Sequence, residues 1–111
     1  MAYSIEITKR FEDRLDQAID YVLNTLCAPR AAKAILDEYE QQLERIAQTP
    51  DWFPIDHGLS EIVGAEIHRA IVRSYRILYW INESTQTVHL VSFRHRTEDI
   101  STFEDRPFSE N

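Results

Sequence analysis

Two β-prone segments that follow each other closely constrain this chain more than any other feature. Residues 75–82 (YRILYWIN) and 87–95 (TVHLVSFRH) are rich in β-branched and aromatic residues. The polar residues around 82–86 (NESTQ) separate them. Because the connection is so short, the pattern predicts two neighbouring antiparallel strands joined by a turn.

The segments before this hairpin alternate in type. Residues 3–8 alternate between apolar and polar side chains, which predicts a short strand. Apolar residues then recur at helical spacing over about 11–26 and again over 29–48, and the proline at 29 suits a first helical position. Residues 65–72 predict a further strand. The expected fold is α+β with the order β-α-α-β-β-β: an antiparallel sheet, joined by the first strand, with an α-helical hairpin on one face.

Two segments fit no regular pattern. Residues 51–64 contain Pro54 and Gly58 and are expected to be irregular. Residues 97–111 carry five acidic residues and one arginine, a net charge of −4. We therefore expect one domain over residues 1–100 and an acidic tail over 101–111.

Charge is distributed unevenly along the chain. The whole sequence has a formal charge of −7, yet residues 67–96 hold five arginines against one carboxylate, Glu83, a local balance of +4. The five arginines are Arg69, Arg73, Arg76, Arg94 and Arg96. This contrast predicts an anion-facing surface or a docking face for an acidic partner.

Strand alternation divides the arginines and their apolar neighbours between two faces. Tyr75, Ile77 and Tyr79 share one face of the first hairpin strand, and Arg76, Leu78 and Trp80 share the other. In the second strand, Leu90, Arg94 and Arg96 fall on one side. Since the helical hairpin covers one face, we expect the face with Leu78, Trp80, Leu90 and the arginines to be covered by the chain's own loops or by a second protein.

Several classes of function are disfavoured. Cys27 is the only cysteine, and the four histidines (57, 68, 89 and 95) have no ligand-like spacing, so we expect no metal site and no cofactor. An isoelectric point of about 5.0 argues against gripping naked nucleic acid through bulk charge. The sequence has no apolar run long enough for a membrane span and no signal-peptide pattern, so cytoplasmic residence without membrane contact is expected.

Several motifs together carry a family resemblance. They are the predicted element order, the helix-closing Thr49-Pro50, the strand YRILY at 75–79 and the closing HRTED at 95–99. Over roughly residues 3–100 the chain resembles the RelE/ParE toxin superfamily, the toxins of bacterial type II toxin–antitoxin modules, often called plasmid stabilisation proteins. The resemblance implies a growth-inhibiting protein that a cognate antitoxin wraps with an extended or helical segment.

The superfamily implies two different activities. RelE-like members cut mRNA in the ribosomal A site without a metal, through clustered Arg, Lys, His and Tyr groups. ParE-like members inhibit DNA gyrase and have no established nuclease chemistry. The chain is therefore a metal-independent endoribonuclease in the first case and not an enzyme in the second. A third possibility is a non-toxic binding protein that retains the fold.

The resemblance assigns roles to particular residues. In a RelE-like reading, Arg76 and Arg96 would stabilise phosphate charge and His95 would move a proton. Nuclease members often place a tyrosine shortly after the last strand, where this chain has Thr102 and Phe103. That departure, and the acidic tail, favour the ParE-like reading.

The expected surface for the target or antitoxin is a larger set of residues. Its members are Arg69, Arg73, Arg76, Leu78, Trp80, Leu90, Arg94 and Arg96. The alternative is that Arg76, Arg94 and Arg96 merely pair with carboxylates such as Glu66, Glu83, Glu98 or Asp99. The resemblance also predicts assembly as a homodimer or as a hetero-oligomer with antitoxin.

Overall fold

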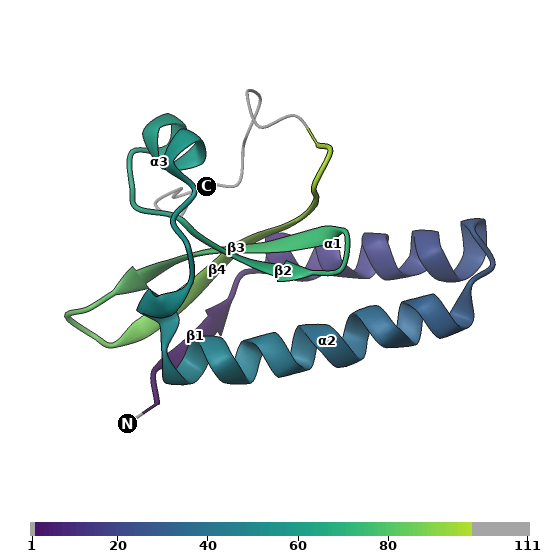
Figure 1. Ribbon diagram of the computed structural model, residues 1–111, viewed down its shortest axis with the longest axis horizontal. Coiled ribbons are helices and arrows are strands. Elements are labelled where there is room, and N and C mark those ends of the chain that lie inside the picture. Colours follow the sequence, from purple (N-terminus) through teal and green to yellow (C-terminus); the bar gives the residue numbers. More distant parts are fainter. Residues whose placement is uncertain (1, 99–111) are drawn as a thin grey trace.

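The computed structural model describes residues 2–98, which form a four-stranded sheet with helices on both faces (Figure 1). The elements are β1 (Ser4–Ile7), α1 (Lys9–Asp20), α2 (Pro29–Gln48), α3 (His57–Val63), β2 (His68–Val72), β3 (Tyr75–Asn82) and β4 (Thr87–His95). The α1–α2 hairpin lies along one face of the sheet, and α3 lies on the other side. The predicted acidic tail, 101–111, lies outside the described residues.

The sheet has the strand order β1-β4-β3-β2. Strands β2, β3 and β4 form the predicted antiparallel meander, with Tyr75 opposite His95 at one end of the β3–β4 pair. The first strand joins the sheet as expected, but it runs parallel to β4, with Ser4 opposite Thr87. The expectation of an antiparallel sheet is therefore wrong, and the sheet is mixed. Residue alternation predicts the face of a strand but carries no information on its direction.

A side-chain cap marks where the helical hairpin begins, and a change in backbone conformation marks where it turns. The side chain of Thr8 caps α1 by accepting a hydrogen bond from the N–H of Phe11 at 3.0 Å. The helix then widens into a π-helical turn over Tyr21–Thr25, and Cys27 adopts a positive φ of 51° before α2 begins at Pro29. The predicted first helix thus ends in a π turn, which inserts an extra residue before the reversal.

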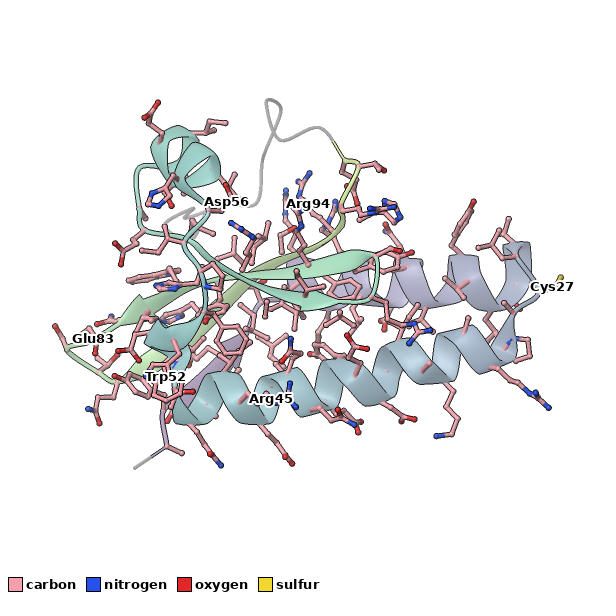
Figure 2. All side chains as sticks on the ribbon, viewed as in Figure 1. Cys27, Arg45, Trp52, Asp56, Glu83 and Arg94 are labelled. Carbon is pink, nitrogen blue, oxygen red and sulfur yellow. The ribbon has the colours of Figure 1, made fainter. Side chains whose placement is uncertain are left out.

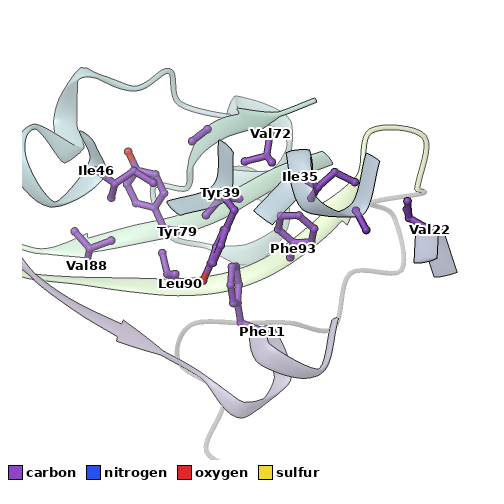
Figure 3. Close-up of a cluster of buried hydrophobic side chains, with 13 residues drawn as sticks. Phe11, Val22, Ile35, Tyr39, Ile46, Val72, Tyr79, Val88, Leu90 and Phe93 are labelled. Atoms are coloured by element: carbon purple, nitrogen blue, oxygen red, sulfur yellow. The ribbon is translucent and has the colours of Figure 1, made fainter. Parts of the chain in front are cut away.

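An aromatic cluster fills the core between the hairpin and the sheet (Figure 3). The cluster holds Phe11 of α1, Tyr39 of α2 and Phe93 of β4. Their ring centroids lie 6.0–6.1 Å from one another. All three residues are buried. Stacked and edge-to-face aromatic contacts of this kind add to the free energy gained by burial.

A second, smaller core lies on the opposite face, where α3 covers the sheet. Leu59 and Val63 of α3 pack against Leu78 and Val91. Asp56 caps this helix by accepting the N–H of Leu59 at 3.0 Å. The expectation that residues 51–64 are irregular missed this helix. A helix this short shows no recurring pattern of apolar residues from which it could be predicted.

A β-bulge changes which residues of β4 face the hairpin. Leu78 pairs with Ser92, but the next residue, Tyr79, pairs with Leu90, so Val91 has no partner on β3. As a result Leu90 is fully buried in the core beneath the helices. We call the sheet face turned away from the α1–α2 hairpin the outer face. The expectation that Leu90 lies on it with Leu78 and Trp80 is therefore wrong, since strict alternation does not hold through a bulge.

Buried phenols give the fold a defined dependence on alkaline pH. Burial, with Glu12 and Glu40 nearby, raises the pKa of Tyr39 to about 12, and burial also raises the pKa of Tyr79. As the pH rises, the unfolded chain therefore loses these two tyrosine protons first, near pH 10. Above that pH the free energy of unfolding falls, because the folded protein still holds the protons. We expect the free energy of unfolding to fall between pH 9 and pH 11, by up to about 1.4 kcal/mol for Tyr39.

Urea unfolding at the two pH values measures this loss. Tyr39→Phe should show a smaller loss than the wild-type protein, whereas Tyr21→Phe, at an exposed position, should not differ from it. Equal losses in Tyr39→Phe and the wild-type protein would contradict the assignment.

Candidate functional site

Three arginines meet on the outer face of the sheet, beside α3. Arg76 of β3 and Arg94 of β4 stand opposite each other in the strand register, and Arg96 follows just beyond the end of β4. With Asp56 and Leu59, they line a hollow of about 20 Å³. Figure 2 shows Arg94 on the α3 side of the sheet, with Asp56 nearby. We call Arg76, Arg94 and Arg96 the arginine cluster.

The members of the arginine cluster differ in how their charge is balanced. Arg94 is buried, its Nε donates to Ser92 Oγ at 3.1 Å, and its Nη1 lies 3.6 Å from Glu98 Oε1. Within residues 2–98, the guanidinium groups of Arg76 and Arg96 form no ion pair. Among the described residues, the expected pairing with carboxylates thus occurs for Arg94 and not for Arg76 or Arg96.

His95 is held by the turn that follows β4. Its backbone N–H donates to Glu98 Oε2 at 2.8 Å, and the backbone N–H of Thr97 donates to its Nδ1 at 3.2 Å. Because Nδ1 accepts a hydrogen bond, the neutral imidazole carries its proton on Nε2. Any proton transfer by His95 would therefore use Nε2. Asp99, one of the carboxylates that the alternative pairs with the arginines, lies outside the described residues.

A larger cavity of about 500 Å³ adjoins the arginine cluster on the other side of His95. It lies between α1 and the ends of β3 and β4, and its lining includes Arg14, Tyr75 and Glu98. The ring of Tyr75 lies edge-on to that of His95, with centroids 5.2 Å apart, and burial raises the pKa of its phenol. Tyr75 therefore places a phenol beside His95, although the sequence after the last strand lacks one. The signal that reveals it is the hairpin register, which sets Tyr75 opposite His95.

The two remaining arginines lie apart from the cluster. Arg69 Nη1 donates to the carbonyl of Ile55 at 3.3 Å and ties β2 to the segment before α3. Arg73 sits in the β2–β3 turn at a φ of 56°, and its Nη1 lies 3.9 Å from Glu38 of α2. Arg73 is therefore directed to the helical hairpin and does not join the others.

The apolar residues expected on the open face are mostly enclosed. Leu78 is on the predicted face, but α3 covers it and leaves it 3% exposed. Leu90 is on the opposite face, as described above. Trp80 is half-buried and stacks on His89, with centroids 4.9 Å apart. Of the three, Trp80 is the one that a partner at the surface can contact.

The described residues carry few signs of other kinds of site. Between residues 2 and 98, no three His, Cys, Asp or Glu side chains are grouped closely enough to bind a metal ion together. No helix in that range has the length and apolar character needed to cross a bilayer. Cys27 is exposed at the tip of the helical hairpin.

The sequence matches the family model described as the ParE toxin of the type II toxin–antitoxin system parDE, over residues 5–100. The chain belongs to the ParE toxin family. This match covers β1, the helices and the whole hairpin with the arginine cluster. The superfamily resemblance is thereby confirmed, and with it the class of protein: a toxin of a type II toxin–antitoxin system.

Two solved structures similar to this ParE-family toxin are toxin–antitoxin complexes. One is the RelBE2 complex from Mycobacterium tuberculosis, with a TM-score of 0.58 and 21% identity, covering 86% of this chain and 100% of that one. Another is the archaeal RelE–RelB complex from Pyrococcus horikoshii, with a TM-score of 0.58 and 16% identity, covering 89% and 100%. At these identities the likeness shows the shared fold. No curated protein matched the sequence.

Proposed function

We propose that this ParE-family toxin inhibits cell growth by acting on DNA gyrase and is neutralised by a cognate antitoxin. The observation that carries the proposal is the pair of guanidinium groups, Arg76 and Arg96, that no described carboxylate balances in a chain of net charge −7. Such a local patch fits an acidic segment or surface of a protein partner. Membership of the ParE family supports the choice of gyrase as target.

The geometry supports protein binding over RNA cleavage. The hollow at the arginine cluster itself, about 20 Å³, is far below the roughly 300 Å³ at which pockets for bound small molecules begin. The cavity of about 500 Å³ beside it is large enough, but the arginine that lines it, Arg14, pairs with Glu98. One of its three cations, Arg94, is offset by Glu98. The chain's lysines, Lys9 and Lys33, both lie in the helical hairpin and not at the cluster. Little cationic charge therefore remains to offset repulsion from ribosomal RNA.

A metal-independent endoribonuclease remains the second candidate because of one observation. Tyr75 and His95 place a phenol and an imidazole side by side, close to two available arginines. Cleavage of RNA by its own 2′-OH needs a base, an acid and cations near the phosphate. In that reading His95 Nε2 and the Tyr75 phenol would move protons, and Arg76 and Arg96 would bind the phosphate.

The antitoxin is proposed to lie on the outer face of the sheet. Arg76, Trp80, Arg94 and Arg96 line this face, and Arg69 borders it at β2. Leu78 is not part of the proposed binding surface because α3 covers it. A chain that retains the fold without toxicity is the third candidate, and it predicts normal growth on expression.

A supercoiling assay with purified gyrase tests the proposed target. We expect the toxin to inhibit supercoiling of relaxed plasmid DNA, and an equimolar amount of antitoxin to restore it. Arg30→Ala, at an exposed position of α2, should inhibit as well as the wild-type protein. If the toxin left supercoiling unchanged but cleaved mRNA on translating ribosomes, the gyrase proposal would be wrong.

A further inference from the structure

A separate cavity lies at the other end of the outer face, where β3 runs past the start of β2. Pairing between the two strands ends at Tyr79, which stands opposite His68, so the next residues of β3 have no β2 partner among the described residues. A cavity of about 250 Å³ occupies this edge. It is bounded by Trp80 of β3, by Glu66 and by the segment around Asp51. We call it the edge cavity.

The lining of the edge cavity is acidic and aromatic. Three carboxylates line it, from Asp51, Glu66 and Glu83, together with the indole of Trp80, and no lysine or arginine is among the described residues that line it. Carboxylates and an aromatic face together favour a cation. The volume is below the roughly 300 Å³ of small-molecule pockets, so a single side chain is the better fit.

The buried imidazole of His68 also borders the edge cavity. His68 is 4% exposed, and its Nδ1 lies 2.9 Å from the carbonyl of Phe53. A carbonyl oxygen only accepts, so Nδ1 carries the proton and Nε2 of the neutral ring is an acceptor. That Nε2 lies 3.7 Å from Glu66 Oε1, another acceptor. A cationic donor in the cavity could reach both the Nε2 of the neutral ring and the carboxylate of Glu66.

We propose that the edge cavity binds one arginine side chain of a partner polypeptide. A guanidinium offers five donors in a planar fork, which suits several acceptors spread around a cavity, and it stacks on aromatic rings. The partner is a segment of the antitoxin, so this inference rests on the proposed function.

Charge on the outer face gives the partner segment a direction. The arginine cluster lies toward one end of β3 and β4, and Glu83, beside the edge cavity, lies at the turn that closes their other end (Figure 2). Suppose that a partner segment carries acidic residues at one end and an arginine at the other. When the acidic end lies over the arginine cluster and the arginine enters the edge cavity, each end of the segment faces the opposite charge. The reversed segment would place like charges together at both ends, which costs binding free energy. The edge cavity thus fixes the orientation of the antitoxin.

An NMR titration of the full chain tests the cavity with a defined probe. The probe is Nα-acetyl-arginine amide, and the matched control ligand is Nα-acetyl-citrulline amide, which has the same shape without the charge. We expect the arginine probe to shift the indole N–H signal of Trp80 in a saturable way, and citrulline to leave it unchanged. The indole of Trp52, 81% exposed, serves as an internal reference for non-specific stacking. Equal shifts with both probes, or a shift at Trp52 alone, would overturn the proposal.

A pair of variants separates the cavity from the net charge of the protein. Glu66→Gln with Glu83→Gln should weaken binding of the arginine probe by about fivefold, as expected for the loss of two exposed charge contacts. Glu40→Gln with Glu44→Gln, at exposed positions of α2, removes the same charge elsewhere and should bind as the wild-type protein does. Equal weakening in both pairs would overturn the proposal. Failure here with intact gyrase inhibition and neutralisation would leave the proposed function standing, because those assays do not involve the probe.

Discussion

Leu90→Glu will leave the chain largely unfolded at room temperature. Leu90 is fully buried in the core between the hairpin and the sheet, near Phe11 (Figure 3). The change removes apolar packing and places a carboxylate where no partner is present, and each of these costs several kcal/mol. A combined loss above about 4 kcal/mol approaches the whole stability of a small domain. Circular dichroism and thermal unfolding of the purified variant measure the effect.

The matched control is the same substitution at a surface position. Leu26, at the tip of the helical hairpin, is 55% exposed, so Leu26→Glu should change the free energy of unfolding by less than about 0.5 kcal/mol. A folded Leu90→Glu protein with a cooperative thermal transition would show that Leu90 faces outward. It would thereby contradict the bulge between β3 and β4.

Arg76→Ala will abolish growth arrest while leaving the fold intact. Arg76 is half-buried on the outer face, near the end of β3 where the arginine cluster lies, and no described carboxylate pairs with it. Its removal therefore leaves no buried charge behind and should cost little stability. An arginine that becomes buried in an interface commonly contributes about 2 kcal/mol or more, so target affinity should fall by roughly 30-fold. Colony counts after induction, with protein levels matched by immunoblot, measure the loss.

Arg30→Ala is the control for a general loss of positive charge. Arg30 is exposed near the start of α2, in the helical hairpin, so its removal changes the net charge equally without touching the outer face. This variant should arrest growth as the wild-type protein does. Arrest by Arg76→Ala at matched protein levels would remove the arginine cluster from the toxic surface.

Local signals in the sequence were sufficient to predict several elements. The bounds of β3 and β4 follow from their alternation and from the polar turn between them. Helix α2 begins at Pro29 and ends at Gln48, before Thr49 and Pro50, because proline fits a first helical position and disfavours helix in the residue before it. Each of these signals acts within a few residues, so no tertiary contact is needed to read it.

The features that were missed depend on contacts far apart in the chain. The parallel pairing of β1 with β4 joins residues about eighty positions apart, such as Ser4 and Thr87. The bulge at Val91 lets Leu90 and Val91 serve the two different cores, a choice made by packing and not by propensity. Helix α3 is seven residues long and is stabilised by the second core that it covers.

In the candidate site too, some positions follow from local sequence signals, and others depend on contacts between distant parts of the chain. Strand alternation predicts that Arg76 and Arg94 lie on one face, and the structure sets them opposite each other there. Arg73 carries the same charge, but its position in a turn directs it to Glu38. Alternation predicts that Tyr75 faces the helices, and at the strand end its ring also contacts His95. Residue type alone does not distinguish these outcomes.

Inducible expression in a bacterial host tests the central claim most directly, with the DNA damage response and global mRNA integrity read in the same cultures. A gyrase-directed toxin predicts growth arrest with induction of the damage response and intact mRNA, and no arrest when antitoxin is co-expressed. Cuts in mRNA at translating ribosomes without a damage response would contradict the proposed target and favour the nuclease reading of His95 and Tyr75. Normal growth with neither signal would contradict toxicity itself.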